Sequence, residues 1–239
     1  MASLIQKVTL FTAEEIAEVT GRYPRLGAVR DGVVEGILDL HAVFNSEERR
    51  DQFEVRIVAP PGYPDSVPSL TETGGRTAAI AARYGITDQS DLHRNPGDGS
   101  ACLCVKQEER LRFPGGANLS RFVEGLVVPY LFGLSHFDEY GKWPWPDRSH
   151  GALGTIEYYA EVAAEPSAGS IGETLDLLKV DPVWRELRKQ LRKPSAMRIC
   201  VCGSRKPISR CHKDAWAAIL KLNGDMRKLG LNFRAMLQR

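Results

Sequence analysis

VVEGILDLHAVF at residues 33–44 and QFEVRIVA at residues 52–59 decide the fold of this chain. Apolar residues recur in both segments with a strand-like rhythm, and in the second segment they alternate with charged residues. Such alternation is typical of a half-buried β-strand. We therefore predict two antiparallel strands joined by a hairpin turn over residues 45–50.

A helix is predicted before these strands. Thr12 is a suitable N-cap, and Glu15 three residues later completes a capping box. Ile16 and Val19 give the segment a short apolar stripe. Together these residues predict a helix over residues 12–21.

The segment after the second strand contains three short motifs. Tyr63-Pro64-Asp65-Ser66-Val67-Pro68 comes first, His93-Arg94-Asn95 follows, and Gly99-Ser100-Ala101-Cys102-Leu103 is third. In this order they resemble the ubiquitin-conjugating enzyme family. That family has an antiparallel meander of strands, then a Tyr-Pro-x-x-x-Pro turn, a His-Pro-Asn tripeptide and a Gly-x-Ile-Cys-Leu segment. Here Arg94 replaces the proline, and the interval from Asn95 to Cys102 is one residue shorter than usual.

The resemblance covers about residues 10–165 and implies an α+β fold, with an antiparallel meander sheet flanked by helices. Trp143-Pro144-Trp145-Pro146 and Ser149-His150-Gly151 resemble segments of the bacterial branch of the family. That branch is encoded beside cGAS-like nucleotidyltransferases in CBASS antiphage defence operons. Eukaryotic members keep a tryptophan shortly after the cysteine, and residues 105–113 lack one.

The resemblance implies a role for three residues. Cys102 is the expected nucleophile, which forms a thioester with the C-terminus of a partner protein. Asn95 matches the asparagine that positions the loop or donates to the oxyanion. His93 matches a histidine that is chiefly structural in the family.

A thiol of ordinary pKa, about 8.5, is only slightly ionised at neutral pH. Positive charge from Arg94 or Lys106 would therefore help Cys102 react. Cys104 remains an alternative: it is the true nucleophile, a resolving thiol or a small hydrophobe. Both cysteines could instead be buried and inert, as unpaired cysteines commonly are.

The C-terminal region contains a set of four metal ligands. Cys200, Cys202, Cys211 and His212 have the spacing C-x-C-x8-C-H. Three sulfurs and one nitrogen can enclose Zn²⁺ in a tetrahedral site, at about 2.3 Å and about 2.0 Å respectively. With four protein ligands no position stays open, which indicates a structural zinc.

The same segment resembles the SEC-C motif, a small zinc-binding tail with the pattern C-x-C-G-S-G-K followed by Cys-Cys or Cys-His. Gly203 and Ser204 match the turn after the second cysteine, where backbone N–H groups can face the thiolate sulfurs. Arg205 stands where the pattern usually has glycine.

Charge is distributed unevenly along the 239 residues. Residues 171–239 hold 16 basic and 6 acidic residues, a balance of +10, whereas residues 1–170 hold 16 and 24, a balance of −8. A basic tail could bind nucleic acid or an acidic protein, or form a solvated helix face. Basic residues are not interleaved with aromatic ones, and the body is acidic, so nucleic acid is an unlikely partner.

Cysteine usage and hydropathy indicate the compartment. Three of the five cysteines lie in the zinc loop, which suits a reducing environment better than a disulfide framework. Residues 1–11 contain no apolar run typical of a signal peptide, and no later stretch has the roughly 20 apolar residues of a membrane span. We expect a cytoplasmic protein without membrane contact.

Residues 163–170 are rich in Ala, Pro, Ser and Gly and suggest a boundary. We predict a ubiquitin-conjugating-like domain over residues 1–164, a linker with helices over residues 165–195, and a zinc-binding tail over residues 196–239.

The first functional hypothesis is a ubiquitin-conjugating-like enzyme. Its expected partner, implied by the resemblance, is a cGAS-like nucleotidyltransferase. A ubiquitin-activating-like enzyme is a further candidate partner, and the sequence leaves open whether one is needed. The alternative is a non-catalytic adaptor of the same fold that binds protein or nucleic acid through its basic zinc tail. A nucleic-acid-binding zinc protein is a third hypothesis, which predicts affinity that falls steeply with salt.

Overall fold

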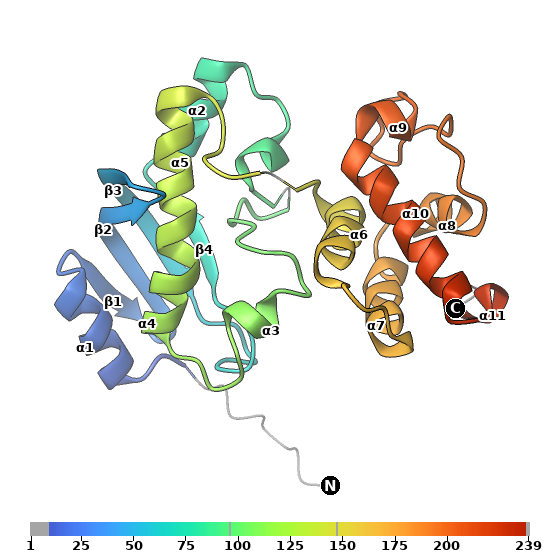
Figure 1. Ribbon diagram of the computed structural model, residues 1–239. Coiled ribbons are helices and arrows are strands. Elements are labelled where there is room, and N and C mark those ends of the chain that lie inside the picture. Colours follow the sequence, from blue (N-terminus) through green and yellow to red (C-terminus); the bar gives the residue numbers. More distant parts are fainter. Residues whose placement is uncertain (1–9, 96, 147, 238–239) are drawn as a thin grey trace, which may run out of the picture. The chain divides into compact units, whose positions relative to one another are not determined.

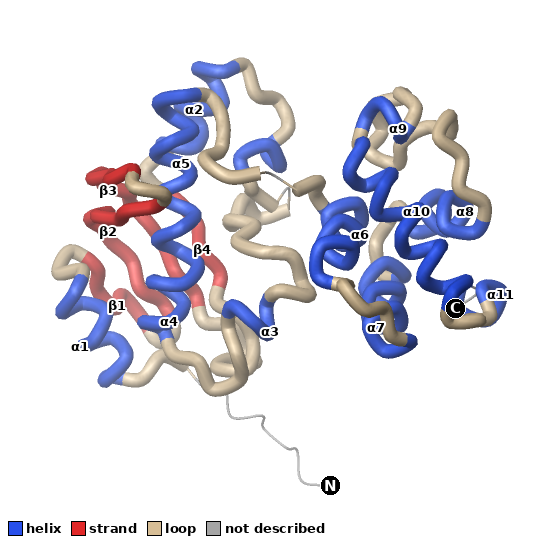
Figure 2. Tube along the Cα trace, in the orientation of Figure 1, coloured by secondary structure: helices blue, strands red, loops and turns tan. Residues whose placement is uncertain are grey.

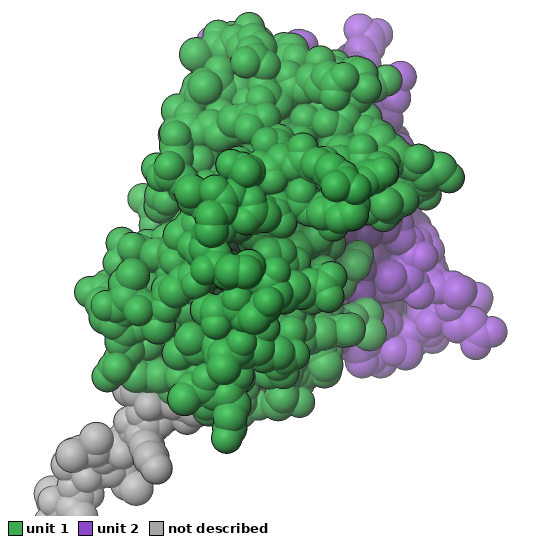
Figure 3. Space-filling model, turned by 90° about the vertical axis from the view of Figure 1, so that its left-hand side faces the viewer, with its two compact units in different colours: residues 1–104, 108–146 green, residues 105–107, 147–239 purple. Residues whose placement is uncertain are grey.

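The computed structural model describes residues 10–95, 97–146 and 148–237. In these residues α-helices are combined with one antiparallel four-stranded sheet (Figure 1), as the helix and strand colouring of Figure 2 makes plain. The chain divides into two compact units, residues 1–104 with 108–146 and residues 105–107 with 147–239 (Figure 3). The predicted combination of an antiparallel sheet with helices is confirmed.

The first unit contains the whole sheet. Its elements are α1 (Ala13–Arg22), β1 (Leu26–Arg30), β2 (Val33–Phe44), β3 (Glu47–Val58), β4 (Ser69–Glu72), α2 (Arg76–Tyr84), the 3₁₀ turn η1 (Gln89–Leu92), α3 (Glu109–Arg112), α4 (Leu119–Phe122), the π-helical turn η2 (Val123–Val127) and α5 (Val128–Tyr140). The strands lie in the order β1-β2-β3-β4, and each pairs antiparallel with the next. The sheet is therefore a simple meander.

The predicted hairpin is confirmed, but its turn is shorter than residues 45–50. Pairing runs from Val33 opposite Val58 to Phe44 opposite Glu47. Only Asn45 and Ser46 remain in the turn, and both have positive φ angles, of 48° and 68°. Two-residue turns of this kind have the twist that a hairpin requires. The charged residues that follow belong to β3, not to the loop.

The capping box of α1 is present as predicted. The Thr12 hydroxyl accepts a hydrogen bond from the Glu15 N–H (3.2 Å), and the Glu15 carboxylate accepts one from the Thr12 N–H (2.7 Å). Glu15 also accepts from the Tyr63 hydroxyl and from the Leu119 N–H. One carboxylate thus joins α1 to the Tyr63–Pro68 turn and to α4. This turn connects β3 to β4, so it lies within the meander rather than after it.

Helix α5 packs on β2 and β3 (Figure 1). Its apolar residues Leu131 and Leu134 are fully buried, as are Leu38 and Ile57 of the sheet. Burial of such side chains supplies about 1.5–3 kcal/mol each. The core of this unit therefore lies between the sheet and the α4–α5 segment.

The second unit is helical. It contains α6 (Gly151–Val162), α7 (Ala168–Lys179), α8 (Trp184–Arg192), α9 (Ile208–Cys211), α10 (Lys213–Lys228) and α11 (Phe233–Leu237). Ile156 and Tyr159 of α6 share one apolar core with Ile219 and Leu222 of α10. Helix α6 therefore groups with the C-terminal residues, whereas the predicted domain ranges placed it in residues 1–164.

Candidate functional site

His93, Asn95 and Cys102 lie in one loop of the first unit, between η1 and α3. Arg94 and Ala101 form an isolated antiparallel bridge. Beside it, the Cys102 N–H donates to the His93 carbonyl (2.7 Å), and the Ala101 N–H donates to the Leu70 carbonyl of β4 (2.7 Å). The three predicted catalytic residues are thus brought together, and the backbone of the cysteine segment is fixed to the sheet.

Asn95 braces the tip of this loop. Its backbone N–H donates to the Ser100 carbonyl (2.8 Å), and its side-chain amide donates to the Ser100 hydroxyl (2.9 Å). Ser100 donates in turn to Asp98 (2.7 Å). A side-chain amide nitrogen carries two N–H groups, so one remains after the bond to Ser100. Asn95 is exposed, and its observed contacts support loop positioning.

The two thiols of the loop differ in their surroundings. Cys102 and Cys104 are both half-buried, and the Cys102 sulfur lies 4.0 Å from the Cys104 carbonyl oxygen. Cys104 packs against the hydrophobic core. Burial, reinforced by the negative charges of Glu109 and Glu108, raises the pKa of the Cys104 thiol to about 12. At neutral pH Cys104 is protonated and behaves as a small hydrophobe, which leaves Cys102 as the better candidate nucleophile.

The cations expected near Cys102 occupy different units. The Arg94 guanidinium donates to the Gly99 carbonyl (3.1 Å), so its charge lies in the same loop as the cysteine. Lys106 belongs to the second unit. Arg94 therefore belongs to the same loop and the same unit as the candidate nucleophile.

Sequence reasoning missed the side chains of α5 and the following segment that support η1, the turn that precedes this loop. The Trp143 indole N–H donates to the Asp91 carbonyl (3.1 Å), and the Tyr130 hydroxyl donates to the Leu92 carbonyl (3.3 Å). Tyr130 is buried, but no local sequence pattern links either aromatic residue to a turn some forty to fifty residues earlier.

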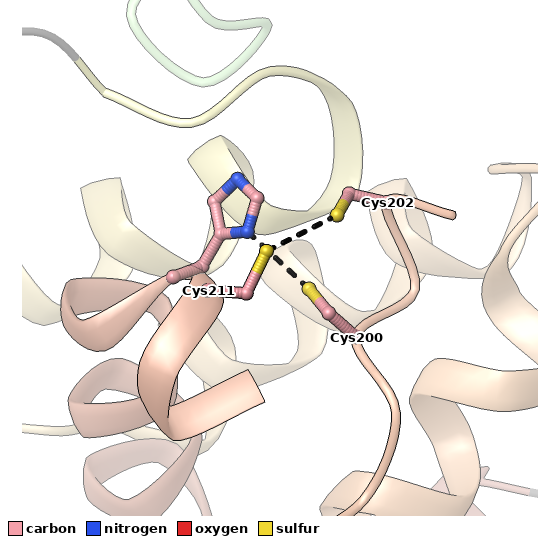
Figure 4. Close-up of side chains that lie close together, drawn as sticks. Cys200, Cys202 and Cys211 are labelled. Carbon is pink, nitrogen blue, oxygen red and sulfur yellow. Dashed lines mark hydrogen bonds between the residues drawn. The ribbon is translucent and has the colours of Figure 1, made fainter. Parts of the chain in front are cut away.

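A second candidate site lies in the second unit, where Cys200, Cys202, Cys211 and His212 converge. Their ligand atoms all lie within 4.8 Å of one another. Figure 4 shows the three thiol groups pointing toward a common centre. The Cys202 and Cys211 sulfurs are 3.5 Å apart, and the Cys200 sulfur is 3.3 Å from His212 Nδ1. Tetrahedral zinc–thiolate sites place sulfurs about 3.8 Å apart, so the donor set fits a zinc ion.

The chain around these ligands forms a compact knuckle. Ile199 pairs with Pro207 in an isolated bridge, and the Cys200 N–H donates to the Lys206 carbonyl (2.9 Å). This pairing returns the chain so that α9 delivers Cys211 and His212 to the first two cysteines. Arg205, at the position where the resembled pattern has glycine, has φ +60°. Glycine suits that position because a left-handed backbone costs residues with a Cβ.

Hydrogen bonds to sulfur support the site, as the turn at Gly203 and Ser204 predicts. Burial raises the pKa of the Cys200 thiol, and the backbone N–H of Cys202 partly offsets this effect. Burial also disfavours the Cys202 thiolate, but the hydroxyl and N–H of Ser204 stabilise it, and the pKa of Cys202 is lowered. The Ser204 hydroxyl also lies 2.9 Å from the Cys211 sulfur. These contacts are the ones that orient thiolates around a metal.

Comparison with protein-family models, with curated proteins and with solved structures gave no match. Among the helices of the described residues, none combines the length and apolar character needed to cross a lipid bilayer.

Proposed function

We propose that this chain is a cytoplasmic ubiquitin-conjugating-like transferase of bacterial antiphage defence, in which Cys102 accepts the C-terminus of a partner protein as a thioester. The main support is the cysteine loop: Cys102 is half-buried, its backbone N–H is bonded to the His93 carbonyl, and the Ala101 N–H is bonded to the Leu70 carbonyl of β4, in an antiparallel meander. The order of the motifs along the chain, described above, is the basis for naming the family.

The reaction exchanges one thioester for another. The Cys102 sulfur bonds to the carbonyl carbon of the partner's C-terminal residue, and the bond from that carbon to the thiol of an activating enzyme breaks. The proton of the Cys102 thiol ends on the departing thiol, so no oxidant is needed. Arg94 favours the attacking thiolate, and Asn95 holds the loop and offers an N–H to the developing oxyanion.

The proposed conjugation partner is a cGAS-like nucleotidyltransferase, and the activating enzyme is a ubiquitin-activating-like protein. Cys200, Cys202, Cys211 and His212 would hold a structural Zn²⁺, which supplies fold stability and no reaction step. We assign no catalytic role to the second unit.

The test is adduct formation in cells that co-express the chain with a candidate nucleotidyltransferase and an activating enzyme. Wild type should form a covalent adduct that a thiol reductant removes on a gel. Cys102→Ser should form an oxygen ester that survives the reductant, Cys102→Ala should form none, and Cys104→Ala should behave as wild type. Intact mass should equal the sum of the two chains minus one water.

An adduct that persists in Cys102→Ala, or its absence in wild type with every component supplied, would contradict the proposal. The adaptor hypothesis would then take precedence. Its own signature is binding of the partner that neither Cys102→Ala nor Cys104→Ala changes.

A further inference from the structure

Trp143, in the segment after α5, contacts the turn that precedes the cysteine loop. Its indole N–H donates to the Asp91 carbonyl (3.1 Å), and its ring lies edge-on to the His93 ring with 4.6 Å between centroids. Trp143 is half-buried and packs against the core of the first unit. One side chain thus holds both the turn and the residue that follows it.

His93 transmits this contact to the cysteine. It has a left-handed backbone, φ +49°, which residues with a Cβ adopt rarely. Such a conformation persists where surrounding contacts hold it in place. The His93 carbonyl accepts the Cys102 N–H (2.7 Å), so the conformation of His93 determines where the Cys102 backbone lies.

Gly133 of α5 provides the space for the indole. A Cβ added at Gly133 would lie 2.6 Å from Trp143 Cζ3 and 2.7 Å from Trp145 Cη2, closer than unbonded carbon atoms approach. The two indole rings are stacked, with 6.1 Å between their centroids and an interplanar angle of 29°. The position of Trp143 is therefore fixed by the helix and not only by the loop that it contacts.

We propose that Trp143 is a positioning residue for Cys102, acting through Asp91 and His93, and that Gly133 keeps it in place. The proposal rests on the proposed function in one respect, the choice of Cys102 as the nucleophile. Trp143 touches no reacting atom in this scheme. Its contribution is to keep the Cys102 amide bonded to His93 and the thiol in one orientation.

The first measurement is amide hydrogen exchange of the full-length protein, which needs no partner. In Trp143→Phe and Gly133→Ala, exchange at the Cys102 amide should accelerate roughly three- to tenfold, because the bond to His93 opens more often. Exchange at Ile57, in the centre of the sheet, should not change. The matched control is Gly125→Ala, where an added Cβ meets Arg121 Nε at 3.8 Å.

The second measurement is the rate of thioester formation at varied partner concentration. In Trp143→Phe, kcat should fall roughly tenfold with KM unchanged. The partner still binds normally, but the Cys102 thiol is no longer held in one orientation. Wild-type exchange and wild-type kcat in both Trp143→Phe and Gly133→Ala would overturn the proposal. Equal acceleration at Cys102 and Ile57 would also overturn it, since it would show general destabilisation.

The two proposals fail separately. If no variant, wild type included, forms an adduct, the proposed function fails, while the exchange data still decide whether Trp143 holds the Cys102 backbone. If adducts form at equal rates in all variants and exchange at the Cys102 amide is also unchanged, the proposed function stands and the positioning role is overturned.

Discussion

The contrast between Cys102 and Cys104 leads to a test at the scale of single residues. Because burial and the nearby Glu109 and Glu108 raise the pKa of Cys104 to about 12, very little of this thiol is ionised at pH 8. Iodoacetamide should therefore label Cys104 in the native protein far more slowly than an exposed thiol of ordinary pKa, and labelling should accelerate as the pH rises. Peptide mass spectrometry after timed labelling would measure both cysteines. Rapid labelling of Cys104 at pH 7 would contradict the assignment.

Arg205 provides a second test. Its φ of +60° costs a residue with a Cβ about 1 kcal/mol, so Arg205→Gly should raise the free energy of unfolding by about that amount. Lys206→Gly is the matched control, because the adjacent backbone is not left-handed and glycine there should bring no gain. Urea denaturation would compare the variants. A loss of stability in Arg205→Gly would mean that its side chain makes contacts worth more than the backbone strain.

Sequence identified residues well where the evidence was local. Four potential metal ligands within thirteen residues indicate a single site, and the ligand atoms of Cys200, Cys202, Cys211 and His212 do lie together. Local spacing could not identify the aromatic partner of His93. Trp143 is fifty residues away, and nothing in the sequence around it indicates which loop it contacts. Local spacing determines a metal knuckle, whereas tertiary packing determines which side chain supports a catalytic loop.

At the scale of elements, alternation predicted the central hairpin but not its full length. Residues 47–50 are charged and fall in the predicted turn, yet they pair with residues 41–44 across the hairpin. These charged residues form ion pairs. His41 of β2 contacts Glu48 of β3, and Arg49 contacts Glu47 and Glu139. The strands β1 and β4 were not predicted, because five or four residues carry too little periodicity, and the nine-residue helix α2 was not predicted either.

The docking of α5 and α2 on β3 depends on Asp51. Burial disfavours its charge, but hydrogen bonds from Ser135 and Arg76 outweigh that effect and lower the pKa of Asp51. Removing the charge in Asp51→Asn should cost about 1–3 kcal/mol at pH 7. A lowered folded-state pKa means that this stabilisation is complete above the unfolded value of about 3.9 and is lost as the pH falls through the folded-state value.

Urea denaturation of wild type and Asp51→Asn between pH 7 and pH 3 would test this. The difference between their free energies of unfolding should decrease as the pH falls. The control is Asp39→Asn, which breaks an exposed ion pair with Arg25 and should change stability little at any pH. If Asp51→Asn lowered the free energy of unfolding equally at pH 7 and pH 3, the loss of stability would come from packing and not from charge.

At the scale of the whole molecule, composition predicted a boundary at residues 163–170, whereas the structure divides the chain before α6. Within this segment, Ser167 caps α7 in a reciprocal bond with Ser170, and α6 and α7 share the C-terminal core. Small polar residues serve both flexible linkers and helix caps. The apolar residues of α6 are the better indicator of where the unit begins, because they have to be buried against another part of the chain.

Metal removal should act on the second unit alone. Structural zinc sites supply on the order of 10 kcal/mol of binding free energy that is coupled to folding. A strong chelator, or Cys202→Ser with Cys211→Ser, should therefore accelerate hydrogen exchange across residues 196–228, while β2 and β3 keep their protection. Native mass spectrometry should find one zinc per chain in wild type and in Ser204→Ala, which retains all four ligands. Retention of metal by the double variant would contradict the assigned ligands.

The cramped packing at Gly133 has a consequence for how this sequence can change over generations. Because a single added methyl group would strike both indoles, alanine at position 133 is acceptable only after the rings at positions 143 and 145 have become smaller. The order of those substitutions is therefore constrained: the rings have to change before the glycine does. In descendants of this chain the helix position and the Trp-Pro-Trp-Pro segment should therefore be inherited as a matched set.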